Sequence, residues 1–244
     1  MREHVLAETA NVISAKKCIA YLQQRPKTEM VGMGLLHGAP GLGKTRFARR
    51  LAYYNDYIYL RLEASMTAKS FAQQLLRLLH YRYALDNASF HGSTNKLFRR
   101  CISILQSNPD AVIIIDEIDY AFTQPVLLGS IRDIVDETIA VVVLVGMKDA
   151  REKLLRANSH YFDRCNYFYE FKRLSRLDVE LVCKEISEVK MKPDLLTYIH
   201  KTTRGNIRQI IKIIEAVEKV SAREQLSIAA LNDLLGDKGT TDAT

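Results

Sequence analysis

The sequence lacks the segments that carry a chain into or across a membrane. No apolar run approaches the ~20 residues that a membrane-spanning helix needs. The N-terminus, MREHVLAETANVISAKKCIAYLQ, mixes apolar and polar residues in an amphipathic pattern, whereas a signal peptide has a continuous apolar stretch. We therefore expect a cytoplasmic protein with no membrane partner.

Cysteine and histidine are present, but without the spacing of a metal site. The four cysteines lie far apart with no CxxC pair, and the six histidines show no ligand spacing. A reduced cytoplasmic compartment and no metal cage are the simplest interpretation. Internal repeats are also missing from the sequence.

The composition is that of a globular protein with excess positive charge. The 244 residues are 48% hydrophobic and 26% charged, enough for one large core or a medium domain plus a small one. The formal net charge is +7. Such an excess is often only a solvated face, but it also favours a polyanionic partner such as nucleic acid.

Short apolar runs alternate with helical patterns over the first 173 residues. The strand-like runs cover residues 33–37, 57–62, 111–115, 139–145 and, more weakly, 166–171. The helical patterns between them cover residues 44–54, 70–83, 95–106, 126–135 and 150–157. This alternation predicts an α/β fold with a five-stranded parallel sheet that is covered on both faces.

The two ends of the chain read differently from the middle. Residues 1–28 predict a helical lead-in to an α/β domain over residues 29–173. After that domain, helical patterns at 178–187, 193–202, 207–221 and 228–234 predict a small helical lid over residues 174–235. The polar tail, residues 236–244, has no hydrophobic face and is expected to be disordered.

A glycine-rich segment between the first strand and the next helix has the pattern of a phosphate-binding loop. Gly38-Ala39-Pro40-Gly41-Leu42-Gly43-Lys44-Thr45 satisfies GxxxxGK[ST]. Its backbone N–H groups and the helix N-terminus would surround the phosphates of ATP. Lys44 would neutralise the β- and γ-phosphates, and Thr45 would place its hydroxyl on Mg²⁺. The expected nucleotide-binding residues are Gly38, Pro40, Gly41, Gly43, Lys44, Thr45 and Arg46; a plain glycine-rich turn is the alternative.

Two carboxylates follow the β-branched run of the third strand. Asp116 and Glu117 come directly after Val112-Ile113-Ile114-Ile115. Ligands of open α/β sheets bind at the edge where strands end. Asp116 would therefore hold Mg²⁺ through its water shell, and Glu117 would polarise the attacking water. Asp119 is expected to cap the helix that follows.

These motifs resemble those of AAA+ ATPases, over roughly residues 30–235. The family places a polar sensor after the fourth strand, but here the strand ends in Gly146-Met147-Lys148-Asp149, without the usual Asn or Thr. Lys148 or Asp149 is the candidate substitute for that sensor.

Two arginines match further positions of the family. Arg164, in HYFDRC, occupies the place of the arginine that a neighbouring subunit supplies to the γ-phosphate. Its alternative role is that of a surface arginine at a helix C-terminus. Arg208, in TRGNIR, resembles the second sensor, in which Asn206 would cap the helix and Arg208 would reach the γ-phosphate of its own subunit.

Longer fragments are similar to the branch of AAA+ proteins that regulates transposition. MGLLHGAPGLGKTR, VIIIDEID, VVVLVGMKDAREKLL and YEFKRLSRLDVELV carry this resemblance. The branch includes the phage Mu transposition protein B and related target-selection ATPases. It implies ATP-dependent, sequence-nonspecific binding to duplex DNA, assembly into a helical filament of identical subunits, recruitment of a transposase, and slow hydrolysis. The phage protein has an added N-terminal DNA-binding domain, so here the AAA+ core is expected to bind DNA itself.

Filament-forming relatives contact DNA through short loops before helices. The corresponding segments here are ASMTAK, with Thr67 and Lys69, and HGSTNK, with Thr94 and Lys96. Hydroxyl and ammonium groups suit phosphate contacts that position a protein without reading sequence. The alternative is that the hydroxyls are helix N-caps and the lysines are solvated.

Two other functions compete with DNA-bound regulation of transposition. One is a switch that acts on a protein partner, as in initiators, helicase loaders or secretion-associated ATPases. An initiator is expected to carry a winged-helix domain after the lid, and a secretion ATPase to carry a membrane segment. The other is an ATP-binding scaffold without hydrolysis, against which the Asp116-Glu117 pair argues.

Overall fold

The computed structural model describes residues 1–2, 5–86, 89–157 and 159–221, which form two compact units. The α/β unit contains residues 14–40 and 44–171. The helical unit contains the described residues up to residue 13, residues 41–43, and the described residues 172–221. The helix expected at 228–234 and the tail at 236–244 lie outside the described residues.

Five short apolar strands form the sheet of the α/β unit. In chain order they are β1 (Met33–Gly38), β2 (Ile58–Arg61), β3 (Val112–Asp116), β4 (Val141–Val145) and β5 (Cys165–Phe171). All pairings are parallel, in the spatial order β2-β3-β4-β1-β5. Every residue of β3 and β4 is buried, as expected where helices cover both faces. The predicted fold class is confirmed.

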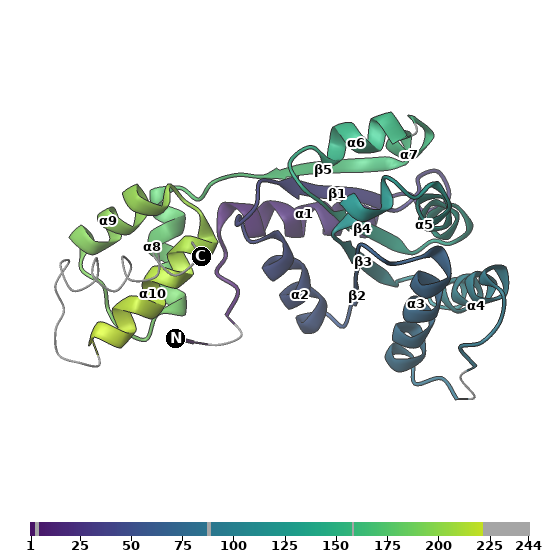
Figure 1. The fold of residues 1–244 in the computed structure, drawn as a ribbon, viewed down its shortest axis with the longest axis horizontal. Helices are drawn as coiled ribbons and strands as arrows, with labels where there is room; N and C mark the ends of the chain where they lie inside the picture. Colours follow the sequence, from purple (N-terminus) through teal and green to yellow (C-terminus); the bar gives the residue numbers. More distant parts are fainter. Residues whose placement is uncertain (3–4, 87–88, 158, 222–244) are drawn as a thin grey trace, which may run out of the picture. The chain divides into compact units, whose positions relative to one another are not determined.

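Helices cover both faces of this sheet (Figure 1). One core includes alternate residues of the strands, among them Leu60 and Ile113, packed with α3 (Ala68–Arg82), α4 (Thr94–Gln106), α5 (Pro125–Glu137) and α6 (Ala150–Ala157). On the other face, α1 (Ala10–Gln24) packs near Gly34, and Phe47 of α2 (Lys44–Tyr54) lies 5.9 Å from Phe171, ring to ring. Two short helices, η1 (Ile118–Ala121) and α7 (Ser159–Asp163), were not expected.

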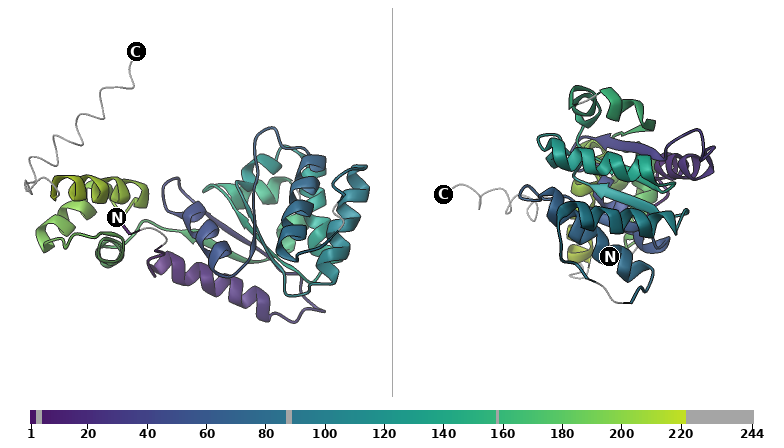
Figure 2. Two further views of the ribbon diagram at one scale, coloured as in Figure 1. Left: turned by 90° about the horizontal axis from the view of Figure 1, so that it is seen from below. Right: turned by 90° about the vertical axis from the view of Figure 1, so that its right-hand side faces the viewer.

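Helices α3 and α4 run side by side in the same direction (Figures 1 and 2). The end of α3 meets the start of β2, because Arg82 donates to the carbonyl of Asp56 at 2.7 Å. The end of α4 meets the segment before β4, because Gln106 donates to the carbonyl of Glu137 at 2.9 Å. Both helices therefore end near the amino-terminal ends of the strands. They begin near the carboxyl-terminal ends of the strands, where β3 ends in Asp116.

The helical unit has its own core. Its helices are α8 (Arg176–Ile186), α9 (Pro193–Thr203) and α10 (Ile207–Ser221), packed through apolar residues such as Val182, Ile199 and Ile214. The beginning of the chain belongs to this unit: Ala7 joins the core, and the side chain of Asn11 exchanges two hydrogen bonds with the backbone of Lys172. The expected lead-in is thus divided between the two units.

All four cysteines are buried thiols without a disulfide. Burial raises the pKa of Cys18, Cys101 and Cys183 to about 12, and raises the pKa of Cys165 still further.

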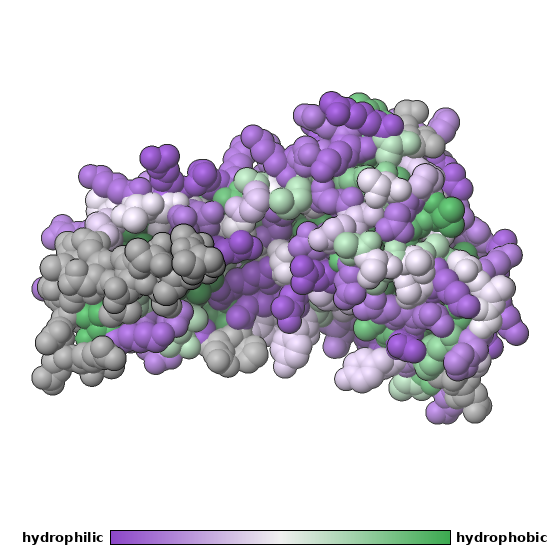
Figure 3. Space-filling model, in the orientation of Figure 1, coloured by the Kyte–Doolittle hydropathy of each residue, from purple (hydrophilic) through white to green (hydrophobic). Residues whose placement is uncertain are grey.

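Among the described residues, no helix is long and apolar enough to cross a membrane. Hydrophilic residues predominate on the face of the molecule in Figure 3.

Candidate functional site

The phosphate-binding loop connects β1 to the first residue of α2. Gly41 has φ +79° and Gly43 has φ +89°, in the left-handed region that a side chain would strain. These two glycines are needed for the tight turn that aims backbone N–H groups at the start of a helix. The segment therefore has the local geometry of an anion-binding loop.

The lysine of this loop is buried and points back into it. Lys44 is 9% exposed, and its Nζ donates to the carbonyl oxygens of Gly38 at 2.6 Å and Ala39 at 3.0 Å. A buried ammonium is costly unless oxygen acceptors surround it. Thr45 and Arg46 follow in the first turn of α2, both partly buried, and burial followed by the charge of Arg50 lowers the pKa of Arg46.

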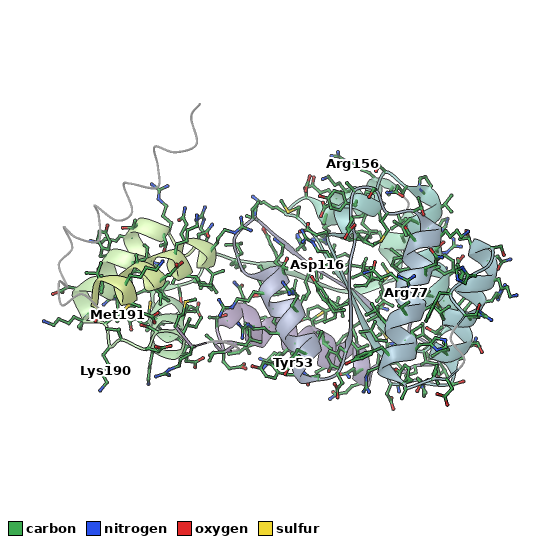
Figure 4. The ribbon with its side chains drawn as sticks, turned by 60° about the horizontal axis from the view of Figure 1, so that its bottom comes forward. Tyr53, Arg77, Asp116, Arg156, Lys190 and Met191 are labelled. Atoms are coloured by element: carbon green, nitrogen blue, oxygen red, sulfur yellow. The ribbon has the colours of Figure 1, made fainter. Side chains whose placement is uncertain are left out.

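Asp116 is the buried carboxylate at the end of β3 (labelled in Figure 4). It is 2% exposed, its Oδ1 accepts the N–H of Glu117 at 2.9 Å, and its Oδ2 accepts the hydroxyl of Tyr59 at 2.8 Å. The hydroxyl and the backbone N–H are both neutral donors, and no Lys or Arg of the described segments forms an ion pair with Asp116. A buried carboxylate supplied with neutral donors alone fits a hard cation such as Mg²⁺, which prefers oxygen ligands.

Glu117 follows with an unusual backbone. Its φ of +58° lies in the left-handed region, which costs a non-glycine residue on the order of 1–3 kcal/mol and is concentrated at functional sites. Its Oε1 lies 3.4 Å from Nη2 of Arg61, at the end of β2. The carboxylates of Asp116 and Glu117 thus have different partners on the same neighbouring strand.

Tyr59 and Arg61 are the site residues that sequence reasoning missed. Neither residue belongs to the phosphate-binding loop, the acidic pair or the arginine positions of the family. The one usable signal was strand alternation, which turns both residues to the face opposite Leu60. Burial, and then the charge of Asp116, raises the pKa of Tyr59, whereas the nearby Arg49 and Arg61 act in the other direction. Tyr59 therefore stays a protonated donor.

Asp119 does not cap a helix, contrary to expectation. Its Oδ2 accepts the N–H of Met147 at 2.7 Å and its Oδ1 lies 3.4 Å from Nζ of Lys153, so it ties η1 to the segment after β4. The carboxylate of Asp119 thus makes this long-range hydrogen bond instead of capping a helix. The proposed substitutes for the first sensor lie in the same segment: the side chain of Lys148 is exposed, and Asp149 pairs with Lys153 at 3.0 Å.

Arg164 lies between α7 and β5 in contact with its own chain. Its Nε donates to Oδ1 of Asp136 at 2.5 Å, and its Nη1 donates to the carbonyl of His160 in α7 at 2.9 Å. The second bond is what a capping arginine makes at a helix C-terminus. The side chain nevertheless remains 32% exposed.

Arg208 lies in the first turn of α10, exposed, after the turn that contains Asn206. Asn206 caps this helix as expected, since its Oδ1 accepts the N–H of Gln209 at 3.2 Å. The N–H of Arg208 donates to the carbonyl of Gly41 at 3.2 Å. Residues 41–43 of the phosphate-binding loop belong to the same compact unit as α10.

The four candidate DNA contacts lie at the beginnings of α3 and α4. Thr67 caps α3, with its hydroxyl accepting the N–H of Ser70 at 3.2 Å. In α4 the cap is Ser93, and Thr94 is the first residue of the helix. Lys69 and Lys96 are both exposed. Because the two helices are parallel, these four residues all lie toward the carboxyl ends of the strands, as Asp116 does.

Several solved structures have a similar fold. The chain is similar to the ORC2 protein of Aeropyrum pernix in its ADPNP–ADP complexes (TM-score 0.70, 12% identity, 95% of this chain and 69% of that one). It is also similar to the Aeropyrum pernix ORC1 protein in complex with DNA (TM-score 0.63, 17% identity, 96% and 66%). The chain thus spans about two thirds of the length of these archaeal proteins.

A third similar structure is domain III of the replication initiation protein DnaA from Thermotoga maritima (TM-score 0.62, 13% identity, 96% of this chain and 95% of that one). No curated protein sequence matches the chain. The sequence does match one family model, described as an AAA domain, over residues 28–154. AAA domains are in general those of nucleotide-hydrolysing ATPases. The match covers more than half of the chain and includes the phosphate-binding loop and Asp116-Glu117, so the chain belongs to the AAA domain family.

Proposed function

We propose that this protein binds ATP·Mg²⁺ and hydrolyses it to ADP and phosphate. The observation that carries the proposal is the buried Asp116, whose donors among the described residues are all neutral and which lies beside the strained Glu117. Lys44 would exchange its two carbonyl partners for the phosphates, and Thr45 and Asp116 would hold the metal. Glu117 would orient the attacking water and take up its proton. Bound Mg²⁺ supplies positive charge to the phosphate oxygens.

Two arginines would complete the site. Arg164 would act on the nucleotide of a neighbouring copy, which requires it to leave Asp136, and its partly exposed side chain is compatible with this exchange. Arg208 would act on the γ-phosphate of its own chain. Hydrolysis then depends on assembly of identical subunits, and we expect it to be slow in the isolated protein.

The activity that we propose for this ATPase is ATP-dependent, sequence-nonspecific binding of duplex DNA in the cytoplasm, with assembly into filaments that direct a transposase to target DNA. Three observations support it: the net charge of +7, the resemblance to transposition regulators, and the placement of Thr67, Lys69, Thr94 and Lys96 on one side of the sheet. One of the similar structures, ORC1, is itself a complex with DNA.

Electron microscopy of the protein with duplex DNA tests this function. Two unrelated duplexes should give the same filaments with ATP and none with ADP. A fluorescent duplex should show affinity that is nearly equal for both sequences and falls steeply with salt, by about 0.9 in log K per unit of log salt for each neutralised phosphate. If the wild-type protein binds no DNA with ATP present, the transposition function is wrong.

A second candidate function is a nucleotide switch that acts on a protein, as an initiator or helicase loader does. The similarity to ORC2 and to domain III of DnaA favours it. A secretion-associated ATPase belongs to the same class. The discriminating result is ATP binding without DNA binding, together with a change in oligomeric state between ATP and ADP measured by light scattering.

A further inference from the structure

A tyrosine on the edge strand reaches the buried carboxylate of the proposed magnesium site. Tyr59 lies on β2, at one edge of the sheet, and its hydroxyl donates a 2.8 Å hydrogen bond to Oδ2 of Asp116. The main-chain register pairs Arg61 with Asp116, so Tyr59 contacts the carboxylate from two residues earlier on the neighbouring strand. This hydrogen bond joins residues 57 positions apart.

The carboxylate of Asp116 is held by two donors of different origin. Its Oδ1 accepts the backbone N–H of the next residue, Glu117. Its Oδ2 depends on the hydroxyl of Tyr59. With Asp116 only 2% exposed, water has little access to replace either donor. Loss of the hydroxyl would therefore free the carboxylate to rotate, or leave one oxygen without a donor.

We propose that Tyr59 is a positioning residue for Asp116, whose hydroxyl fixes the carboxylate in the orientation that meets Mg²⁺–nucleotide. The inference rests on the proposed ATP·Mg²⁺ site. Metal ligands are commonly oriented by hydrogen-bond partners behind them, and losing such a partner typically costs about 10–100-fold in metal affinity. Tyr59 has this relation to Asp116, although it lies outside both the phosphate-binding loop and the acidic pair.

A magnesium titration of nucleotide binding tests the role of Tyr59. Binding of a fluorescent ATP analogue is measured first in EDTA and then with increasing Mg²⁺. Tyr59→Phe keeps the ring and removes the hydroxyl. We expect it to raise the half-saturating Mg²⁺ concentration about tenfold. Its affinity for the analogue in EDTA should stay within about twofold of wild type, because the phosphate-binding loop is unchanged.

Tyr57→Phe is the matched control. It removes a hydroxyl just before the same strand, and within the described part of the chain that hydroxyl makes no hydrogen bond. Its magnesium dependence should equal that of wild type. Should Tyr59→Phe not fold, Tyr59→Met also removes the hydroxyl, and the same tenfold change is expected. The melting temperature of each variant is measured without nucleotide to establish folding.

Three outcomes overturn the inference, and they are distinguishable. If nucleotide binding by the wild-type protein does not depend on Mg²⁺, the proposed magnesium site and this role of Tyr59 are both refuted. If wild type responds to Mg²⁺ and Tyr59→Phe responds identically, only the positioning role is refuted. Equal losses of affinity with and without Mg²⁺ in Tyr59→Phe would show a general structural role instead.

Discussion

The phosphate-binding loop differs in its contacts from the carboxyl end of β3. That end carries Asp116 and Glu117 and is called the acidic edge below. In the loop, Lys44 bonds to carbonyls five and six residues earlier, and two glycines in the left-handed region set the turn. At the acidic edge, the side-chain contacts of Asp116 with Tyr59 and of Glu117 with Arg61 span 57 and 56 residues. The contacts of Lys44 are thus formed within one short segment, whereas the acidic edge exists only once β2 and β3 have paired. Changes within the loop should act directly on nucleotide binding, but the acidic edge can also be altered from another strand.

Arg164→Ala should give the largest loss of hydrolysis, and it tests a contact between subunits in addition to those within one chain. If Arg164 acts on a neighbour's nucleotide, its loss should lower hydrolysis in the assembled state about a thousandfold while ATP binding by the monomer stays nearly unchanged. Steady-state phosphate release and nucleotide titration measure the two quantities. Arg156→Ala removes an exposed arginine whose ion pair, within the described residues, lies inside α6, and serves as control.

The ion pair with Asp136 offers a competing explanation for any effect of Arg164. Asp136→Ala breaks the same pair without removing the guanidinium. If Arg164 serves only its own chain, the two variants should behave alike. Mixing Arg164→Ala with Glu117→Gln subunits should restore some hydrolysis if the arginine acts in trans; a mixture no more active than the sum of its parts contradicts that role.

Glu117→Gln tests the acidic edge itself. The amide cannot take a proton from water, so turnover should fall by about 10²–10³-fold while ATP affinity stays near that of wild type. If assembly requires ATP, filaments of this variant should persist longer after ATP is added, as followed by light scattering. Turnover at the wild-type rate would mean that another residue orients the water.

Lys44→Ala tests the loop. Without the ammonium the triphosphate loses its main counter-charge, and ATP affinity should fall about a hundredfold. Fluorescent-nucleotide titration measures this loss, and melting temperature confirms that the variant folds. Lys44→Ala should weaken binding in EDTA as well as in Mg²⁺, unlike a change at the acidic edge. Unchanged affinity would refute the loop as the nucleotide site.

The smallest effect is expected for DNA binding. Replacing Lys69 and Lys96 together by Ala should weaken duplex binding about tenfold at moderate salt, equally for unrelated sequences, and reduce the salt slope by about one unit for each lost contact. Fluorescence anisotropy at several salt concentrations measures both, and ATP affinity should not change. Lys148→Ala, after β4, is the control and should alter hydrolysis more than DNA affinity. If the double variant keeps its affinity and slope, Lys16 and Lys17 of α1 become the next candidates.

The difference between local and long-range contacts also explains which elements can be predicted from the sequence. The helices at residues 44–54, 150–157 and 207–221 were predicted with their observed bounds, because amphipathic spacing is a local property. The five strands and the parallel sheet also follow from local patterns. Helix α7 was missed because its five residues are too few to show a period. The division of the N-terminal segment at residue 13 depends on long-range contacts and has no local signal.

Within the site, local and non-local residues separate in the same way. The phosphate-binding loop and the acidic pair are contiguous motifs, and their geometry is that of an anion-binding turn and a buried carboxylate. Asp119 was expected to cap a helix because aspartate favours that position, yet its bond goes to Met147, 28 residues away. Tyr59 could not be assigned without the pairing of β2 with β3. The roles of Lys44, Asp116, Glu117, Arg164 and Arg208 remain predictions that the variants above test.

The buried cysteines have a practical consequence for these experiments. A thiol reacts with maleimides and oxidants as its thiolate, and a pKa of about 12 leaves only a minute fraction of Cys18, Cys101 or Cys183 ionised near neutral pH. Cys165 is suppressed further by the same burial. The four native cysteines therefore need not be replaced before a single introduced cysteine is labelled. A cysteine introduced at an exposed position outside the proposed sites, such as Arg156, would carry a fluorophore that reports assembly while the four native thiols stay unmodified.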